Sequence, residues 1–201
     1  MIQLFSNSQT EVKMNIPHHG KYEWLPILYN ITKSLNPNKV VEFGPGVGYT
    51  TVTMARALKD LNSDVTINSH DIWNDDYWGN KQKTLNFIES WGVSDCVNLK
   101  HLNFYDWIEL PNQDREFDLL YFDIDNNSEK LLDLYNNVKH NIDNGSVVLF
   151  EGGSLVRDNY GNTPGVNKMN DVKDKIGYEV LTSDTKYSLS IIYDKNIYKL
   201  D

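Results

Sequence analysis

The chain has 201 residues, of which 40% are hydrophobic, and this length and apolar content suit one compact domain with a sizeable core. Its formal net charge of −9 argues against a nucleic-acid partner, because phosphate binding normally requires a basic face. The single cysteine, the lack of a long apolar run and an opening segment without a basic leader predict a reduced, cytoplasmic protein with no membrane partner.

The first predicted element is a helix over residues 22–35. Trp24, Leu28 and Ile31 recur at near-helical spacing within this segment. The helix is expected to end before Pro37, because the residue that precedes a proline is biased out of the α region.

A short apolar strand, predicted over 39–43, breaks into three closely spaced glycines, Gly44, Gly46 and Gly48. Glycine tolerates positive φ and lets a ligand approach the backbone where a Cβ atom would clash. A purely structural strand-to-helix turn is the alternative, although such a turn rarely needs so many glycines. The segment therefore predicts a turn that cradles a nucleotide-like ligand.

A helix is predicted to follow this turn and to run to about residue 61. Thr50 or Thr51 is expected to be its N-cap, which would aim the free N–H groups of the first turn at the ligand. The dinucleotide fingerprint G-x-G-x-x-G would need a glycine at position 49, but the chain has Tyr49 there. We therefore expect a ligand without phosphates at this turn.

Beyond the turn, predicted strands alternate with predicted helices. Further strands are expected over 65–71, 97–102, 117–123 and 146–150, and further helices over 81–91 and 129–142. This alternation implies a mostly parallel sheet that is covered on both faces. The last two predicted strands, 178–182 and 189–193, are joined by a link too short for a helix, so they should form an antiparallel hairpin.

Residues 42–48, which read E-F-G-P-G-V-G, resemble motif I of the class I S-adenosylmethionine (SAM)-dependent methyltransferases. The C-terminal hairpin is similar to that of this family, whose seventh strand inserts antiparallel between the fifth and the sixth. The resemblance implies an α/β fold with a Rossmann-like, doubly wound, seven-stranded sheet, mostly parallel with an antiparallel C-terminal strand, and with helices on both faces. It also implies one domain over 1–201, in which 1–37 form a helical segment that caps the substrate and 38–201 form the cofactor-binding core.

The resemblance assigns the glycine turn to SAM. It implies that Gly44, Pro45, Gly46 and Gly48 wrap the methionine portion and the ribose of the cofactor. Glu42, at the end of the preceding strand, would approach the methionyl ammonium group, directly or through water.

Three further positions match the adenosine site of the family. Asp71 ends the second predicted core strand, where the family has an acid that accepts hydrogen bonds from both ribose hydroxyls, and its alternative role is a solvated loop acid. Ile72 would pack on the adenosine. Asn103 and Phe104 stand where the family has an acid and an apolar residue around the adenine, and the alternative for Phe104 is an ordinary core residue.

Asp123 closes the predicted strand 117–123, and Glu151 follows the predicted strand 146–150. The carboxyl ends of these strands form the edge at which open α/β sheets bind ligands. The resemblance implies that Asp123 faces the sulfonium end of SAM, and either acid is a candidate for the general base. In metal-dependent family members, acids at these two strand ends and a neighbouring Asn or Asp hold magnesium. Gly152 replaces that third ligand here, so a divalent metal is not favoured and no metal ligand is assigned.

Three more residues have open alternatives. His18 or His19 is a second candidate for the base because an imidazole titrates near neutral pH, and an exposed loop pair is the alternative. Arg157 would hold a substrate carboxylate or form a salt bridge.

The sequence thus predicts methyl transfer from SAM to a small-molecule acceptor by in-line displacement, with a hydroxyl oxygen as the expected acceptor atom. The alternatives are another transferase or an oxidoreductase on the same scaffold, and a cofactor-binding protein without catalysis. A homodimer is compatible with this prediction.

Overall fold

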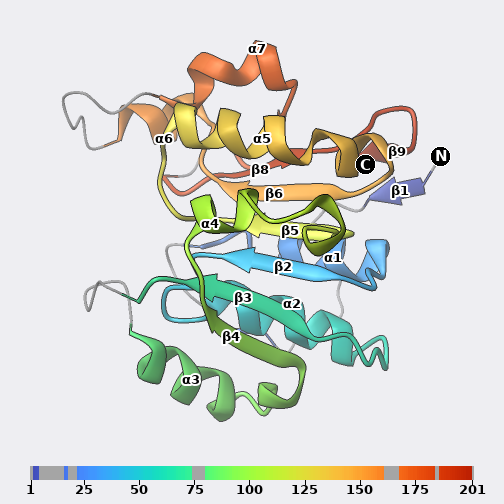
Figure 1. Ribbon diagram of the computed structural model, residues 1–201, viewed down its shortest axis with the longest axis vertical. Helices are drawn as coiled ribbons and strands as arrows, with labels where there is room; N and C mark the ends of the chain where they lie inside the picture. The colour runs from blue at the N-terminus through green and yellow to red at the C-terminus, as the bar shows by residue number, and fades with distance from the viewer. Residues whose placement is uncertain are drawn as a thin grey trace.

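Seven strands form one sheet within the residues that the structure describes (Figure 1). The computed structural model describes residues 2–4, 16–17, 22–73, 80–160, 168–183 and 186–200. The strands are β2 (Val40–Phe43), β3 (Ile67–Asp71), β4 (Val97–His101), β5 (Leu119–Phe122), β6 (Val147–Glu151), β7 (Glu179–Val180) and β8 (Leu189–Ile192). Their order across the sheet is β4-β3-β2-β5-β6-β8-β7.

The direction of the strands confirms the predicted topology. The five strands β4, β3, β2, β5 and β6 run parallel to one another, whereas β8 runs antiparallel to both β6 and β7. β8 is the last strand of the sheet in the chain, yet it lies between β6 and β7. This mostly parallel sheet with an inserted antiparallel strand is the Rossmann-like fold expected from the sequence.

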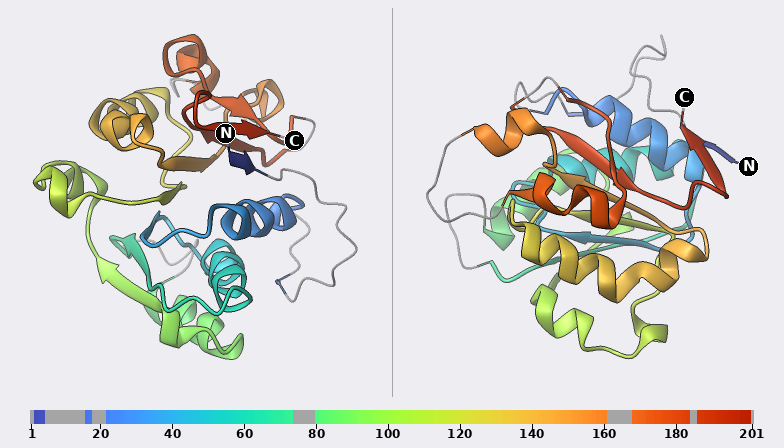
Figure 2. Two further views of the ribbon diagram at one scale, coloured as in Figure 1. Left: turned by 90° about the vertical axis from the view of Figure 1, so that its right-hand side faces the viewer. Right: turned by 90° about the horizontal axis from the view of Figure 1, so that it is seen from above.

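Helices cover both faces of the sheet (Figure 2). They are α1 (Leu25–Leu35), α2 (Tyr49–Lys59), α3 (Lys81–Ser90), α4 (Phe104–Ile108), α5 (Ser128–Asp143), α6 (Leu155–Asn159) and α7 (Lys173–Ile176). Side chains of α1, α2 and α3 join one apolar core, and side chains of α4, α5 and α7 join the other.

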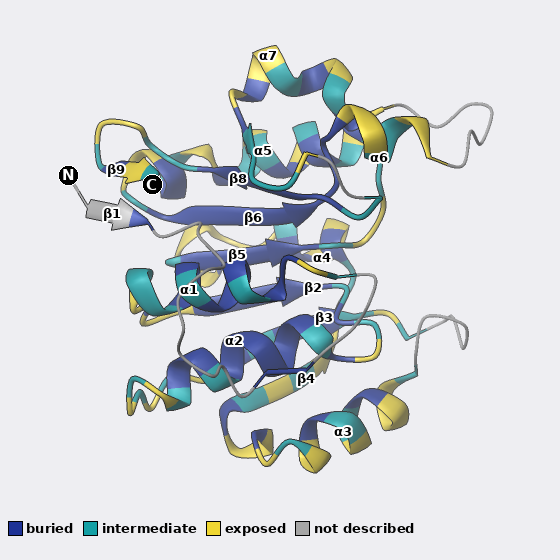
Figure 3. Cartoon of the chain, turned by 180° about the vertical axis from the view of Figure 1, so that it is seen from behind, coloured by how far each residue is buried: buried dark blue, intermediate teal, exposed yellow. Residues whose placement is uncertain are grey.

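Two apolar cores arise because successive residues of a strand point to opposite faces of the sheet. In β5, Leu119 and Tyr121 face the helices α1 and α2, while Leu120 and Phe122 face α4 and α5. The central strands β2, β5 and β6 are buried along their whole length (Figure 3). A strand buried on both faces is mostly apolar, which is why these segments read as apolar runs. The exceptions are Glu42 and Glu151, whose carboxyl groups accept hydrogen bonds from other side chains.

Several element bounds differ from the sequence prediction. α1 begins at Leu25 rather than at 22, and Pro26 stands in its first turn, where the missing N–H costs no helical hydrogen bond. α2 ends at Lys59 rather than at 61, and Asn62 then takes a left-handed backbone with φ of 54°. β5 begins at Leu119 rather than at 117, and the Asp118 side chain just before it accepts a hydrogen bond from the N–H of Asn38 at 2.6 Å.

The ends of the described chain form a second, small sheet that was not predicted. β1 (Ile2–Leu4) pairs in parallel with β9 (Tyr198–Leu200). Leu4 is fully buried in the core beside α1.

The division into a cap over 1–37 and a core over 38–201 stays a prediction. No helix in the described ranges has both the length and the apolar character needed to cross a bilayer.

Candidate active site

Three glycines with left-handed backbones connect β2 to α2. The φ angles are 78° at Gly44, 53° at Gly46 and 107° at Gly48, so the expected positive φ values are confirmed. A Cβ atom at Gly44 would lie 2.0 Å from the carbonyl oxygen of Asp123, which follows β5. Gly44 therefore needs to be glycine for a structural reason as well, because the backbone after β5 leaves no room for a side chain there.

The N-cap of α2 is Gly48, so the prediction of Thr50 or Thr51 at this position is wrong. Both hydroxyl groups have another partner. Thr50 Oγ1 donates to Glu42 Oε1 at 2.6 Å, and Thr51 Oγ1 donates to Glu42 Oε2 at 2.6 Å. The left-handed glycine begins the helix, which leaves the two threonines in the first turn to face the acid at the end of β2.

Glu42 is fully buried beneath the glycine turn. Besides the two threonine hydroxyls, its Oε2 accepts a hydrogen bond from Ser69 Oγ of β3 at 2.7 Å. Burial raises the pKa of Glu42, and the three hydroxyl donors oppose this rise because they stabilise the ionised form. The contact of Glu42 with a methionyl ammonium group stays a prediction.

Asp71 and Ile72 lie at the carboxyl end of β3, next to the glycine turn. Asp71 Oδ1 accepts a hydrogen bond from the N–H of Trp73 at 2.9 Å, and its Oδ2 makes none within the described part of the chain. Ile72 is 37% exposed. His70, beside them, stacks on Phe43, and burial lowers its pKa to about 4, so this imidazole is uncharged at neutral pH.

Asn103 and Phe104 lie after β4, where α4 begins. Asn103 is the N-cap of this helix, and its Oδ1 accepts a hydrogen bond from the N–H of Tyr105 at 2.9 Å. Phe104 is 3% exposed and packs edge-on against Phe122, with the ring centroids 5.1 Å apart. The alternative role of Phe104 as a core residue is therefore confirmed. Contacts of either residue with an adenine stay a prediction.

Glu151 ends β6 and is the centre of a polar cluster. Arg157 Nε donates to Glu151 Oε1 at 2.9 Å, and Arg157 Nη2 donates to Glu151 Oε2 at 3.3 Å. Asn126 Nδ2 donates to the same Oε2 at 2.7 Å. The salt-bridge alternative for Arg157 is confirmed, and its partner is a carboxylate that is 3% exposed. The sequence pattern alone gave no sign of this pairing.

Asp123, after β5, interacts electrostatically with Glu151 and Arg157, and its side chain is only partly buried. Burial raises the pKa of Asp123 well above its usual range, and the nearby Glu151 raises it further, whereas Arg157 opposes the rise. Burial also raises the pKa of Glu151, but Arg157 and Asn126 favour its ionised form. The two carboxyl groups therefore differ: Glu151 is held as the counter-ion of Arg157, whereas Asp123 keeps its proton to a higher pH than an ordinary aspartic acid.

Two further glycines reverse the chain after β6, so that Arg157 can contact Glu151. Gly152 and Gly153 have φ angles of 113° and 85°, and they turn the chain sharply after Glu151. Ser154 then caps α6, with its Oγ accepting a hydrogen bond from the N–H of Arg157 at 3.0 Å. The arginine thereby returns to the acid that ends the strand.

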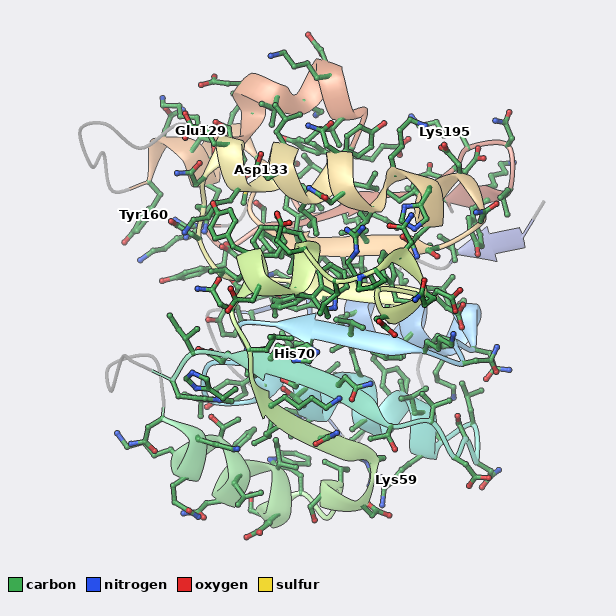
Figure 4. The ribbon with its side chains drawn as sticks, viewed as in Figure 1. Lys59, His70, Glu129, Asp133, Tyr160 and Lys195 are labelled. Atoms are coloured by element: carbon green, nitrogen blue, oxygen red, sulfur yellow. The ribbon has the colours of Figure 1, made fainter. Side chains whose placement is uncertain are left out.

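Exposed apolar side chains gather at the same edge of the sheet. Of the eight large apolar side chains that are exposed among the described residues, six lie within five residues of the carboxyl end of a parallel strand. These six are Val47, Ile72, Tyr105, Ile124, Leu155 and Val156. Figure 4 shows Tyr160 at this edge and Lys59 and Lys195 at the opposite one. Such a concentration is typical of a binding site rather than of a solvated surface.

The remaining candidates of the sequence prediction cannot be placed at this edge. His18 and His19 lie outside the described residues. The acids and glycines named above come together because parallel strands end at one edge of a sheet.

Comparisons with known proteins agree with this geometry. Residues 41–151 match the family described as "Methyltransferase domain". No protein with a curated description matches the sequence.

Solved structures with the same fold include three bound to SAM or SAH. An O-methyltransferase from Bacillus cereus in complex with SAH is 16% identical with a TM-score of 0.62, and the match covers 90% of this chain and 85% of that chain. TomG from Streptomyces achromogenes, an O-methyltransferase of tomaymycin synthesis in complex with SAM, is 16% identical with a TM-score of 0.61, covering 84% and 78%. An SAH-bound methyltransferase from Podospora anserina is 13% identical with a TM-score of 0.59, covering 85% and 78%. At such identities the likeness concerns the fold.

Proposed function

The chain belongs to the methyltransferase domain family, and we propose that it transfers a methyl group from SAM to a hydroxyl oxygen of a small-molecule acceptor. One observation carries this proposal: the three left-handed glycines after β2 lie between Asp71, which ends β3, and Asp123, which follows β5. A backbone without side chains and two flanking carboxyl groups suit a ligand that has an amino-acid end and a ribose.

The described residues fit SAM at this edge. Among the described residues only Asp71 Oδ1 accepts a hydrogen bond, from the N–H of Trp73, so Oδ2 can accept from ribose hydroxyls. Val47 in the glycine turn and Ile72 next to Asp71 are both exposed, and they offer apolar surface to an adenosine. Bound SAM supplies an electrophilic methyl group, so the chain needs to align the acceptor and to remove its proton.

Asp123 is the better candidate for the general base of the two acids. Both oxygens of Glu151 accept hydrogen bonds from Arg157 or Asn126, whereas Asp123 is partly exposed. The raised pKa of Asp123 means that its carboxylate is a stronger base than that of an ordinary aspartate. Ile124, which is 40% exposed beside it, supports an acceptor with apolar surface.

Calorimetry with SAM, SAH and NAD tests the cofactor. We expect SAM and SAH to bind and NAD not to bind, and binding of NAD alone would contradict the proposal. Radiolabelled methyl transfer to a panel of hydroxylated small molecules then tests the reaction. Persistent SAM binding without any transfer would favour a cofactor-binding protein that lacks catalysis.

Asp71→Ala is expected to weaken SAM binding by roughly 10- to 100-fold, the usual value of hydrogen bonds to a charged acceptor. The fold should be unaffected, because Asp71 ends β3 and is only partly buried. Calorimetry gives the affinity. Asp64→Ala is the matched control, since Asp64 is an exposed acid before β3, away from the carboxyl edge. Equal affinities for the two variants would mean that the ribose site lies elsewhere.

A further inference from the structure

The ends of β5 and β6 carry two carboxyl groups, Asp123 and Glu151, at the positions where metal-dependent members of the resembled family hold magnesium. Magnesium requires several oxygen ligands in a near-octahedral arrangement. Here the Glu151 carboxylate already accepts hydrogen bonds from Arg157 and Asn126 on both of its oxygens. A cation at this carboxylate would have to displace a guanidinium that is bound through two N–H groups.

A third ligand cannot come from position 152. Gly152 has a φ of 113°, and a Cβ atom there would lie 2.2 Å from Asn126 Oδ1 and 2.6 Å from Met169 Sδ. Among the described residues, no three His, Cys, Asp or Glu side chains come together in a way that would hold a metal ion. The residues at this edge therefore do not fit a divalent cation.

A fixed positive charge lies at this position instead. The Arg157 side chain is 20% exposed, and its guanidinium carbon lies 5.4 Å from the centroid of the Tyr187 ring. The Glu151 carboxylate and this aromatic ring therefore both orient the guanidinium. Arginine stays charged at all physiological pH values. Glu151 takes only some of the N–H groups that a guanidinium carries, and the others can donate to an acceptor oxygen.

We propose that the guanidinium of Arg157 takes the place of a divalent cation beside Glu151 and binds the acceptor hydroxyl by hydrogen bonds, so that the reaction needs no metal. This proposal rests on the proposed function, and it narrows the chemical class of the acceptor. Because Glu151 already neutralises the charge of Arg157, the pair suits an uncharged alcohol or phenol better than a carboxylate.

Titration of the protein with Mn²⁺, followed by water-proton relaxation, tests the substitution of the cation. The wild-type chain is expected to show no saturable binding at millimolar Mn²⁺. Arg157→Ala should bind Mn²⁺ about 10-fold more tightly or better, because it removes a positive charge from beside two carboxyl groups. The double variant Arg157→Ala/Glu151→Gln should lose this gain. Circular dichroism reports whether each variant folds.

Saturable Mn²⁺ binding by the wild-type chain that Glu151→Gln removes would overturn the proposal, and this result does not depend on the folding of Arg157→Ala. An Arg157→Ala variant that folds but binds Mn²⁺ as weakly as the wild type would also overturn it. SAM calorimetry on the same samples separates the two proposals. Failure to bind SAM would refute the methyltransferase function, whereas SAM binding together with a wild-type Mn²⁺ site would refute only the role of Arg157.

Discussion

Gly44→Ala is expected to lower the free energy of unfolding by about 4 kcal/mol, combining backbone strain with a steric clash. The added Cβ atom would lie 2.0 Å from the carbonyl oxygen of Asp123, so the backbone after β5 would have to move. The φ of 78° is also unfavourable for any residue with a side chain. Urea denaturation followed by circular dichroism measures the change.

Gly177→Ala is the matched control. Gly177 has a φ of 76°, almost the same as that of Gly44, but a Cβ atom there would meet no atom of the described residues within 4 Å. It should therefore cost only about 1 kcal/mol, the penalty for the left-handed backbone alone. Equal losses in the two variants would show that the segment after β5 yields easily and that the contact with Gly44 matters little.

Glu42→Ala is expected to lower the free energy of unfolding by about 4 kcal/mol, because it leaves a cavity and deprives three buried hydroxyl groups of their acceptor. These hydroxyls belong to Thr50, Thr51 and Ser69. Glu42→Gln should cost about 1 kcal/mol or less, since it keeps the volume and the hydroxyls can rotate to match the amide. A similar loss in both variants would mean that the negative charge itself, rather than the packing and the hydrogen bonds, is required.

The stabilities of the wild type and of Glu42→Gln should depend differently on pH. Burial raises the pKa of Glu42 above its usual value of 4.5, so the folded state binds this proton more tightly than the unfolded state. The stability that Glu42 contributes is therefore full below pH 4.5 and falls as the pH rises through the folded-state pKa. Relative to the wild type, Glu42→Gln should gain stability over this range, as denaturation at several pH values would show.

The sequence predicted the large sheet because its signals are local. Continuous apolar runs marked the buried strands, and the short link after 178–182 required a hairpin. The pair of β1 and β9 was missed because each strand is very short and its partner lies at the other end of the chain. The short helices α4 and α6 were also missed, although Asn103 and Ser154 are typical N-cap residues that mark where they begin.

The sequence could predict those residues of the candidate site whose position depends only on the order and direction of the strands. Asp71, Asp123 and Glu151 reach one edge because parallel strands end there. Side-chain partners could not be predicted in the same way. Arg157 meets Glu151 only because two left-handed glycines reverse the chain, and Thr50 turns to Glu42 only because Gly48 begins the helix.

The order of the strands also sets an order of assembly during synthesis. β7 leaves the ribosome before β8, but within the described residues it pairs only with β8. Until Leu189–Ile192 has been made, one side of β6 and both sides of β7 therefore expose unpaired N–H and C=O groups, which are open to pairing with other chains. The last strand of the large sheet to be synthesised is the one that seals its interior, and a nascent chain stalled before it would be prone to aggregate.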